Sequence, residues 1–233
     1  MQFHIETQMQ FPMARVLLNQ GETARIQRGS MVYSSPGVEL NARMNASGEG
    51  LGKFVRAVAR SAVSGESAFI TEVVCQAPYG EVAIAPTYPG TIAQLDVGAV
   101  QYRLNDGAFL ALDPAVAYTM ERQSVGKAVF GGQGGLWVMT TNGQGPLLVN
   151  AFGSISEIPL NNANGFVVDN RHVVAWDRNL NYQIQLQSGF FGSMGTGEGL
   201  VNVFSGTGKI LIQSLNLETF AAALNPFLPQ RSS

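Results

Sequence analysis

The 233-residue chain contains few charged residues and a single cysteine. Charged residues make up 13% of the chain, and the formal net charge is −2. Nucleic-acid-binding proteins usually carry a basic excess that neutralises phosphates, so this balance argues against nucleic acid as a partner. The single cysteine, Cys75, excludes an intrachain disulfide. Its apolar neighbours indicate a small buried side chain rather than a reactive thiol.

The chain also lacks an apolar run long enough to span a membrane. Its N-terminus has neither the basic start nor the apolar core of a secretory signal, so we expect a cytoplasmic protein. With so little charge to cover its surface, the protein is expected to bury part of its exterior against another subunit or partner. We therefore expect a homo-oligomer, of which a trimer is one option.

Glycine and short apolar runs dominate what is present. The segment from Gly131 to Gly153 has a glycine-rich start and two apolar runs, which flank the turn Asn142-Gly143. Asn-Gly tolerates the positive φ angles of a tight turn, so this segment predicts a β-hairpin. Comparable segments follow Gly65 and Gly197, and the lead glycines at positions 65, 132 and 197 are almost evenly spaced. The sequence therefore predicts a threefold internal repeat.

Further short strands are predicted within each copy. In the first copy Ala24 and Ile26 alternate with Arg25 and Gln27, which is the pattern of a half-buried strand. The turn–strand segments that we expect to correspond in the three copies start near Met31, Ala108 and Phe166. With 27 glycines and 10 prolines available for tight turns, the chain is predicted to form at least a dozen strands.

The predicted copies occupy nearly the whole chain, at about 1–88, 89–152 and 153–228. A unit of about five short strands cannot bury its apolar face alone, so the copies should pack around a shared core in a single domain. The predicted fold is all-β. It is either a triplicated β-sandwich or a set of short double-stranded β-helix repeats, in a pseudo-threefold arrangement with two short helices.

The two predicted helices differ in their setting. The segment Leu217–Leu224 has Asn216 as an N-cap, and Asn225-Pro226 marks its end. Residues 51–64 form a helical insertion in the first copy only. Its apolar face contains Leu51, Phe54, Val55, Val58 and Ala62, and its basic face contains Lys53, Arg56 and Arg60.

The insertion at 51–64 is the candidate partner surface. Its basic residues beside an apolar face could contact an anionic membrane or a protein partner. The helix could equally cap the β core and leave its three charges in solvent. Both interpretations remain open on the sequence alone.

The chain offers few groups for catalysis or cofactor binding. His4 and His172 are far apart and form no His-x-His pair, so His172 is interpreted as a polar turn residue rather than a metal ligand. No serine lies in a Gly-x-Ser-x-Gly motif. The glycine clusters at 131–135 and 195–199 lead into strands rather than helices, which does not favour phosphate binding. We predict no catalytic residue, cofactor or metal site.

A family resemblance rests on the stretch Gly165–Asp177, GFVVDNRHVVAWD. Gly65-Glu66-Ser67, Gly197–Leu200 and Gly206–Gln213 match the same pattern in the same order. The chain thereby resembles the mitochondrial-biogenesis family named for altered inheritance of mitochondria, whose members usually have a glycine where Arg171 stands here. The resemblance implies a β-rich fold similar to that of the tryptophan RNA-binding attenuation protein, triplicated in one chain. It implies no activity, and the lack of a transit peptide points to a bacterial or archaeal member.

These patterns favour a non-enzymatic binding or scaffolding protein. One alternative is a small-molecule-binding or enzymatic β-helix protein with a site between the copies. RNA binding is a weaker alternative, because it follows only from the analogy of fold.

Overall fold

The computed structural model describes residues 1–6, 10–44, 69–123, 136–186 and 199–229. These residues form seventeen strands, the α-helix α3 (Leu217–Leu224) and two short 3-10 helices, η1 (Asn170–His172) and η2 (Asn225–Phe227). The all-β class is confirmed, and so is the predicted C-terminal helix with its Asn216 cap. The predicted helix at 51–64 lies outside the described residues. In the part described, no helix is long and apolar enough to cross a membrane.

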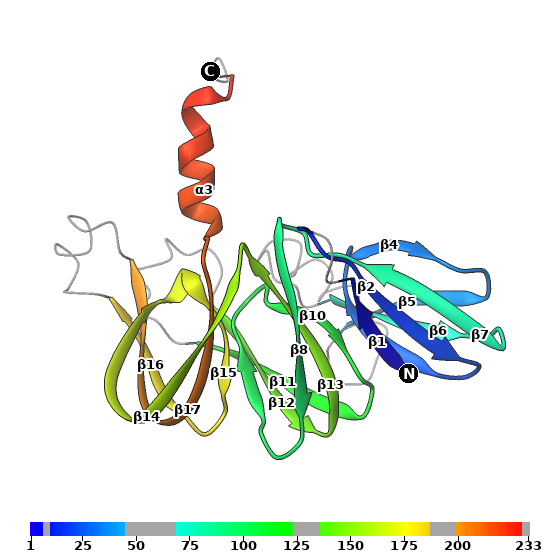
Figure 1. The fold of residues 1–233 in the computed structure, drawn as a ribbon, viewed down its shortest axis with the longest axis horizontal. Helices are drawn as coiled ribbons and strands as arrows, with labels where there is room; N and C mark the ends of the chain where they lie inside the picture. Colours follow the sequence, from blue (N-terminus) through cyan, green and yellow to red (C-terminus); the bar gives the residue numbers. More distant parts are fainter. Residues whose placement is uncertain (7–9, 45–68, 124–135, 187–198, 230–233) are drawn as a thin grey trace, which may run out of the picture.

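The strands form three successive groups that lie in a row (Figure 1). Group 1 contains β1 (Gln2–Ile5), β2 (Ala14–Asn19), β3 (Thr23–Gln27), β4 (Met31–Ser34), β5 (Val38–Met44), β6 (Phe69–Cys75) and β7 (Tyr79–Ile84). Group 2 contains β8 (Gly90–Val97), β9 (Tyr102–Leu104), β10 (Phe109–Leu112), β11 (Val116–Arg122), β12 (Trp137–Gly143) and β13 (Gly145–Phe152). Group 3 contains β14 (Ile155–Asp169), β15 (Val173–Asp177), β16 (Asn181–Leu186) and β17 (Leu200–Gln213).

The same antiparallel pairing occurs in each group. In group 1, β7 pairs with β2 and β4, and β6 pairs with β3 and β5. In group 2, β13 pairs with β8 and β10, and β12 pairs with β9 and β11. In group 3 the long strands β14 and β17 pair along both halves, β15 pairs with the second half of β17, and β16 pairs with its first half. Each group thus contains two three-stranded halves, and in group 1 the strand β1 is added beside β2.

One strand pair joins each group to the next. β3 pairs with β10, with Ile26 opposite Ala111, and β9 pairs with β15, with Leu104 opposite Ala175. A six-stranded sheet, β5-β6-β3-β10-β13-β8, therefore spans groups 1 and 2, and a seven-stranded sheet spans groups 2 and 3. The remaining four-stranded sheet, β1-β2-β7-β4, belongs to group 1 alone.

The predicted hairpin at Asn142-Gly143 is wrong. The strands on either side of it, β12 and β13, lie in different sheets and pair with other strands. Gly143 and Gly145, with φ of 128° and 149°, carry the chain directly from one sheet to the other instead of reversing it. β6 and β7 are likewise divided between two sheets, whereas β17 continues without a turn through Gly206–Gly208.

The predicted correspondence of Phe166 with Met31 is also wrong. β4, β10 and β15 share an irregularity of register after their first residue, where each pairs with β7, β13 or β17. The counterpart of Met31 in group 3 is therefore Val173, the first residue of β15. Phe166 lies on β14 opposite Phe204. The apolar triplets that follow Met31 and Phe166 look alike, but composition alone carries no information about register.

The described residues form three hydrophobic clusters, and two of these contain side chains from the following group. The group 1 cluster contains three side chains from β10 and β13, namely Leu110, Ala111 and Leu148. The group 2 cluster contains their counterparts from group 3, namely Val174, Ala175 and Leu211. The group 3 cluster is built around Trp176 and Phe204, which are fully buried. Each joint between groups is thus a continuous apolar core as well as a strand pair.

Candidate functional site

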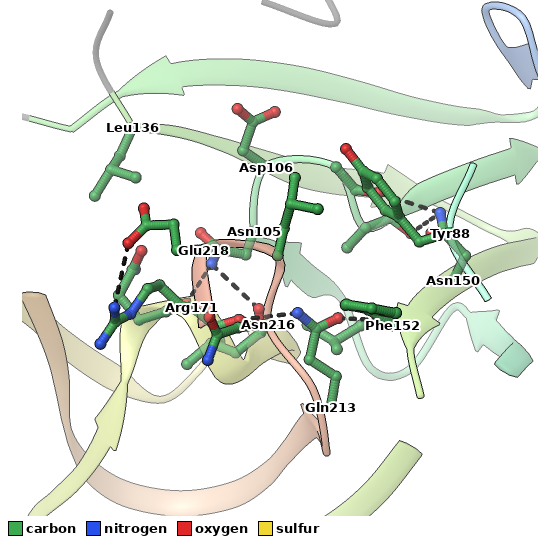
Figure 2. A pocket seen from close by; sticks show the side chains of 16 residues that line it. Tyr88, Asn105, Asp106, Leu136, Asn150, Phe152, Arg171, Gln213, Asn216 and Glu218 are labelled. Carbon is green, nitrogen blue, oxygen red and sulfur yellow. Dashed lines mark hydrogen bonds and ion pairs between the residues drawn. The ribbon is translucent and has the colours of Figure 1, made fainter. Parts of the chain in front are cut away.

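A pocket of about 460 Å³ lies where groups 2 and 3 meet, beside the start of α3 (Figure 2). Its walls come from the β9–β10 turn, from β13, from η1, and from the segment that runs from β17 into α3. Most of the polar side chains that line it are amides.

Two asparagines fix the wall that comes from group 2. The Asn105 Nδ2 group donates to the carbonyl oxygens of Asn170 (2.8 Å) and Val173 (3.1 Å), so it ties the β9–β10 turn to η1. The buried Asn150 Nδ2 group lies within 3.1–3.2 Å of the carbonyl oxygens of residues 107, 108 and 109. Turns present several carbonyls without strand partners, and an amide side chain satisfies them without adding charge.

Gln213 links the two groups from the other side. Its Oε1 atom accepts from the Phe152 N–H at 2.9 Å, and its Nε2 group donates to the Arg171 carbonyl at 2.9 Å. A single side chain at the end of β17 therefore bridges β13 and η1. The pocket walls are held by hydrogen bonds across the joint and not only by strand pairing.

His172 is fixed in one neutral tautomer by its neighbours. Asn216 accepts from the Thr219 N–H through Oδ1, as the N-cap of α3, so its Nδ2 group faces the His172 Nε2 atom at 2.9 Å. Nε2 therefore accepts, and the ring proton lies on Nδ1, which donates to the Gln213 carbonyl at 2.7 Å. Both ring nitrogens are engaged, which couples η1 to the cap of the helix.

Among the described residues, three charged side chains form an ion network at the edge of the pocket. Arg171 donates to both carboxylate oxygens of Asp169, with an Nη2–Oδ2 distance of 2.7 Å, and through Nη1 to Glu218 at 3.2 Å. The hydrogen bonds to Asp169 raise the pKa of Arg171 above its ordinary value, so the guanidinium stays charged. This network connects η1 to the first turn of α3.

Aromatic rings form the apolar wall. The Phe152 ring lies 5.8 Å from the Tyr88 ring and 5.2 Å, edge to face, from the Phe220 ring of α3. Contacts of this geometry are favourable beyond the area they bury. The pocket therefore combines one aromatic wall with amide walls, a chemistry that suits a small polar molecule carrying hydrogen-bond donors. The Asn105 Oδ1 atom is buried, has no partner among the described residues, and could accept one such donor.

The sequence-predicted sites have different outcomes. The candidate surface at 51–64 lies outside the described residues, as do both glycine clusters except Gly199. The structure places His172 in a short 3-10 turn before β15, as expected for a polar turn residue. Among the residues described, no three His, Cys, Asp or Glu side chains are grouped so that they could hold a metal ion. Cys75 is buried and unpaired, as predicted.

Sequence reasoning did not identify the amide groups of the pocket. In the sequence, Asn105 is marked only by its place before Asp106-Gly107, and Asn216 only by its place as a helix cap. Asn150 and Gln213 lie in apolar strand segments, where a polar residue at an inward position was a signal that could have been followed. These four amide side chains come together only where turns of groups 2 and 3 meet, and the sequence does not show which turns meet.

Comparison with known proteins gives concordant matches. The model of the family described as mitochondrial biogenesis AIM24 matches residues 3–215. An uncharacterized protein of Streptococcus pyogenes serotype M6 is 54% identical over 233 residues, which is all of this chain and 93% of that protein. An X-ray crystal structure of a Streptococcus pyogenes protein has 50% identity and a TM-score of 0.82, and the match covers 97% of this chain and 99% of that one. The resemblance seen in the sequence is confirmed, and this chain belongs to the mitochondrial biogenesis AIM24 family.

Proposed function

We propose that this protein is a non-enzymatic scaffold that self-associates in the bacterial or archaeal cytoplasm. The observation that carries the proposal is the placement of its exposed large apolar side chains. Most of them lie in three places: β4, the second half of β14, and the segment from Leu215 to Leu228 that includes α3. Exposed apolar residues gathered in this way are typical of protein contact surfaces, whereas single scattered ones are not.

The scaffold is proposed to be one domain of three repeats of a single unit, at about 1–88, 89–152 and 153–228. The recurrence of the same strand pairing in the three groups supports this division. The shared irregularity of register in β4, β10 and β15 supports it independently, because a bulge at the same place in three strands is a specific feature.

The chemistry of the pocket supports a binding role over a catalytic one. A general base needs a free lone pair, but both nitrogens of His172 are occupied by Gln213 and Asn216. The Arg171 guanidinium is likewise bound to Asp169 and Glu218. These groups hold the joint between groups 2 and 3 in place.

Sedimentation velocity over a range of protein concentrations tests self-association. We expect a species larger than one chain that persists at high salt, because apolar contacts are not screened by ions as exposed charges are. A single chain at every concentration would contradict the proposal.

A second candidate function is the binding of a small polar molecule in the pocket between groups 2 and 3. The combination of the Phe152 wall with the unpartnered Asn105 oxygen favours it. A thermal-shift series with polyols and small amides tests this candidate, because a ligand at 100 times its Kd stabilises the folded state by about 2.7 kcal/mol. The response should disappear in Phe152→Ala, and a wild-type protein that responds to none of these compounds would exclude the candidate for them.

A further inference from the structure

At each end of the row, one edge strand that corresponds to a joint strand has no joint partner among the described residues. Inside the chain, β10 and β15 each pair with a strand of the preceding group, β3 and β9. β4 is the group 1 counterpart of β10 and β15, but it pairs only with β7 among the described strands. The second half of β14 is the group 3 counterpart of β3 and β9. Among the described strands it pairs only with β17. In the described part of the chain, β4 therefore lacks a partner like β3 or β9, and the second half of β14 resembles those strands. The second half of β14 in turn lacks a described partner like β10 or β15, which β4 resembles.

The two internal joints have the same register, which defines the contact expected at the ends. Ile26 lies opposite Ala111 in the first joint, and Leu104 lies opposite Ala175 in the second. Ile26 and Leu104 are each five residues before the following bulged strand, and in group 3 this position is Val168. The counterpart of Ala111 and Ala175 in β4 is Tyr33, two residues after Met31.

Exposure separates the free edges from the internal joints. Val32 is 51% exposed, whereas its counterparts Leu110 and Val174 are 0% and 1% exposed. At the opposite end of the row, Val168 is half-buried, whereas its counterparts Ile26 and Leu104 are 1% and 0% exposed. Apolar side chains that are buried at the internal joints are therefore at least partly exposed to solvent at the free edges.

The apolar cores indicate the same missing contact. The group 1 cluster contains four buried side chains from the following group, among them Leu110, Ala111 and Leu148, and the group 2 cluster contains three, Val174, Ala175 and Leu211. The cluster of group 3 contains no side chain from a following group, because the described chain has none after it. The side chains that would occupy these positions are those of β4 and β7 in group 1: Val32, Tyr33 and Ala83.

The most specific observation is a change of residue type at both ends. At the first joint the Arg25 guanidinium donates to the Val116 carbonyl at 3.2 Å and lies 5.9 Å from the centre of the Tyr118 ring. At the second joint Arg103 donates to the Leu180 carbonyl at 3.3 Å and lies 5.2 Å from the Tyr182 ring. Each internal joint thus has an arginine on one side and a tyrosine on the other.

The free ends carry an apolar residue at both of these positions. Arg25 lies six residues before the start of β4, and Arg103 lies six residues before the start of β10. In group 3, the residue six before the start of β15 is Val167. Tyr118 lies nine residues after the start of β10, and Tyr182 lies nine residues after the start of β15. The corresponding residue after the start of β4 in group 1 is Leu40. A valine facing a leucine is a matched apolar pair, whereas an arginine facing a leucine would not be. The two ends differ from the internal joints in complementary ways.

We propose that the second half of β14 in one copy pairs antiparallel with β4 of the next copy. Val168 then lies opposite Tyr33 and Val167 opposite Ser34, in the register of the two internal joints. The smaller valine faces the larger tyrosine, whose hydroxyl already donates to Glu81 at the surface. The proposal rests on the self-association proposed above and names its surface.

A second copy is the partner because one chain cannot join its own ends in this form. β4 and β14 lie at opposite sides of the molecule (Figure 1). Head-to-tail contacts of this kind close into a ring when the rotation between copies allows it and otherwise extend as a filament. Either assembly completes a further antiparallel sheet from strands of two copies, β16-β17-β14 with β4-β7-β2, like the sheets that join groups inside the chain.

A single substitution with a compensating partner tests the joint. Val167→Arg places an unpaired charge opposite Leu40 of the next copy, and we expect it to weaken association at least about tenfold in sedimentation velocity. Adding Leu40→Tyr to every chain recreates the arginine–tyrosine pair of the internal joints and should restore most of the association. The matched control is Val100→Arg, at an exposed valine on neither edge, which should associate like wild type.

Cysteine crosslinking measures the register independently of association strength. In the internal joint the Asn105 N–H bonds to the Val174 carbonyl, so Leu104 and Ala175 form the neighbouring pair without hydrogen bonds, in which side chains lie closest. The equivalent variant is Tyr33→Cys with Val168→Cys, which should give a reducible ladder of linked chains under mild oxidation. Tyr33→Cys with Val167→Cys is one residue out of register and should give much less.

The outcomes separate the two proposals. A wild-type protein that sediments as one chain would contradict both. An assembled wild type that is unaffected by Val167→Arg and gives no ladder from the in-register cysteines would overturn the edge joint alone. Melting temperatures of all variants, followed by circular dichroism, show whether any loss comes from unfolding.

Discussion

Replacing Gly80 by alanine is expected to destabilise group 1, because a side chain already lies where the new methyl group would be. A Cβ atom at Gly80 would be 2.6 Å from the Cys75 Sγ atom and 2.6 Å from the Val38 Cγ2 atom. Real Cβ atoms do not approach heavy atoms so closely, so the strands must move apart. Gly145 and Gly208 hold the same place in β13 and β17 and are also crowded, by Val116 and Leu180.

The magnitude follows from the cost of overpacking a core. Cys75 is fully buried, and the partly buried Val38 packs against the same cluster, so the new methyl group must displace packed side chains. Overpacking of this kind costs about 1–3 kcal/mol. For a chain of this length each kcal/mol lowers the melting temperature by about 2–4 °C. We therefore expect Gly80→Ala to lower Tm by between about 2 and 12 °C.

Chemical denaturation with a double-mutant cycle checks the cause. Cys75→Ala removes the sulfur, so Gly80→Ala should cost less in that background, with a coupling of about 0.5–3 kcal/mol. The control is Gly199→Ala, where nothing lies within 4 Å of the added Cβ, and its effect should stay within about 0.5 kcal/mol. If Gly80→Ala unfolds like wild type, the packing argument is refuted.

Two further substitutions test buried polar groups. Burial raises the pKa of the Asp177 carboxyl, so its contribution to stability is present at low pH and is lost as the pH rises through the folded-state pKa. Asp177→Asn should therefore increase the free energy of unfolding at neutral pH but not in acid, as urea melts at both would show; a loss of stability at neutral pH would contradict this. Asn150→Ala should cost about 1–3 kcal/mol in the same assay, because it removes the side-chain donor to the Gly107 carbonyl. An unchanged midpoint would mean that this hydrogen bond does not contribute to stability.

The parts of the fold that depend on local pattern were predictable. Alternation of Ala24 and Ile26 with Arg25 and Gln27 marks β3, whose two apolar side chains are buried. Asn216 marks the start of α3, because a helix needs an acceptor for its first N–H groups and the sequence supplies one next to the apolar periodicity. In both cases the determining contacts lie within a few residues along the chain.

The parts that depend on pairing between distant strands were not predictable. Asn142-Gly143 has the composition of a hairpin turn, but β12 and β13 each find better partners in strands that lie further back in the chain. The pocket is hidden for the same reason. Asn105 and Gln213 are 108 residues apart and become neighbours only because β9 pairs with β15. Local composition cannot select among sheets whose strands all have similar alternation.

The two free edges also could not be recognised from local sequence, but alignment of the three groups by their strand register identifies them. As isolated residues, Val167 and Leu40 are ordinary apolar positions of β-strands, and nothing in their neighbourhood marks them. Their meaning appears only when the register aligns them with the arginine and tyrosine of the internal joints. If only the tyrosine position had become leucine, an arginine would face an apolar residue across the joint. If only the arginine position had become valine, the tyrosine ring would lack its cation. Both sides change together, although about 127 residues separate them in the chain. This joint change is what the proposed pairing of two copies would require, because a valine on one edge then faces a leucine on the other.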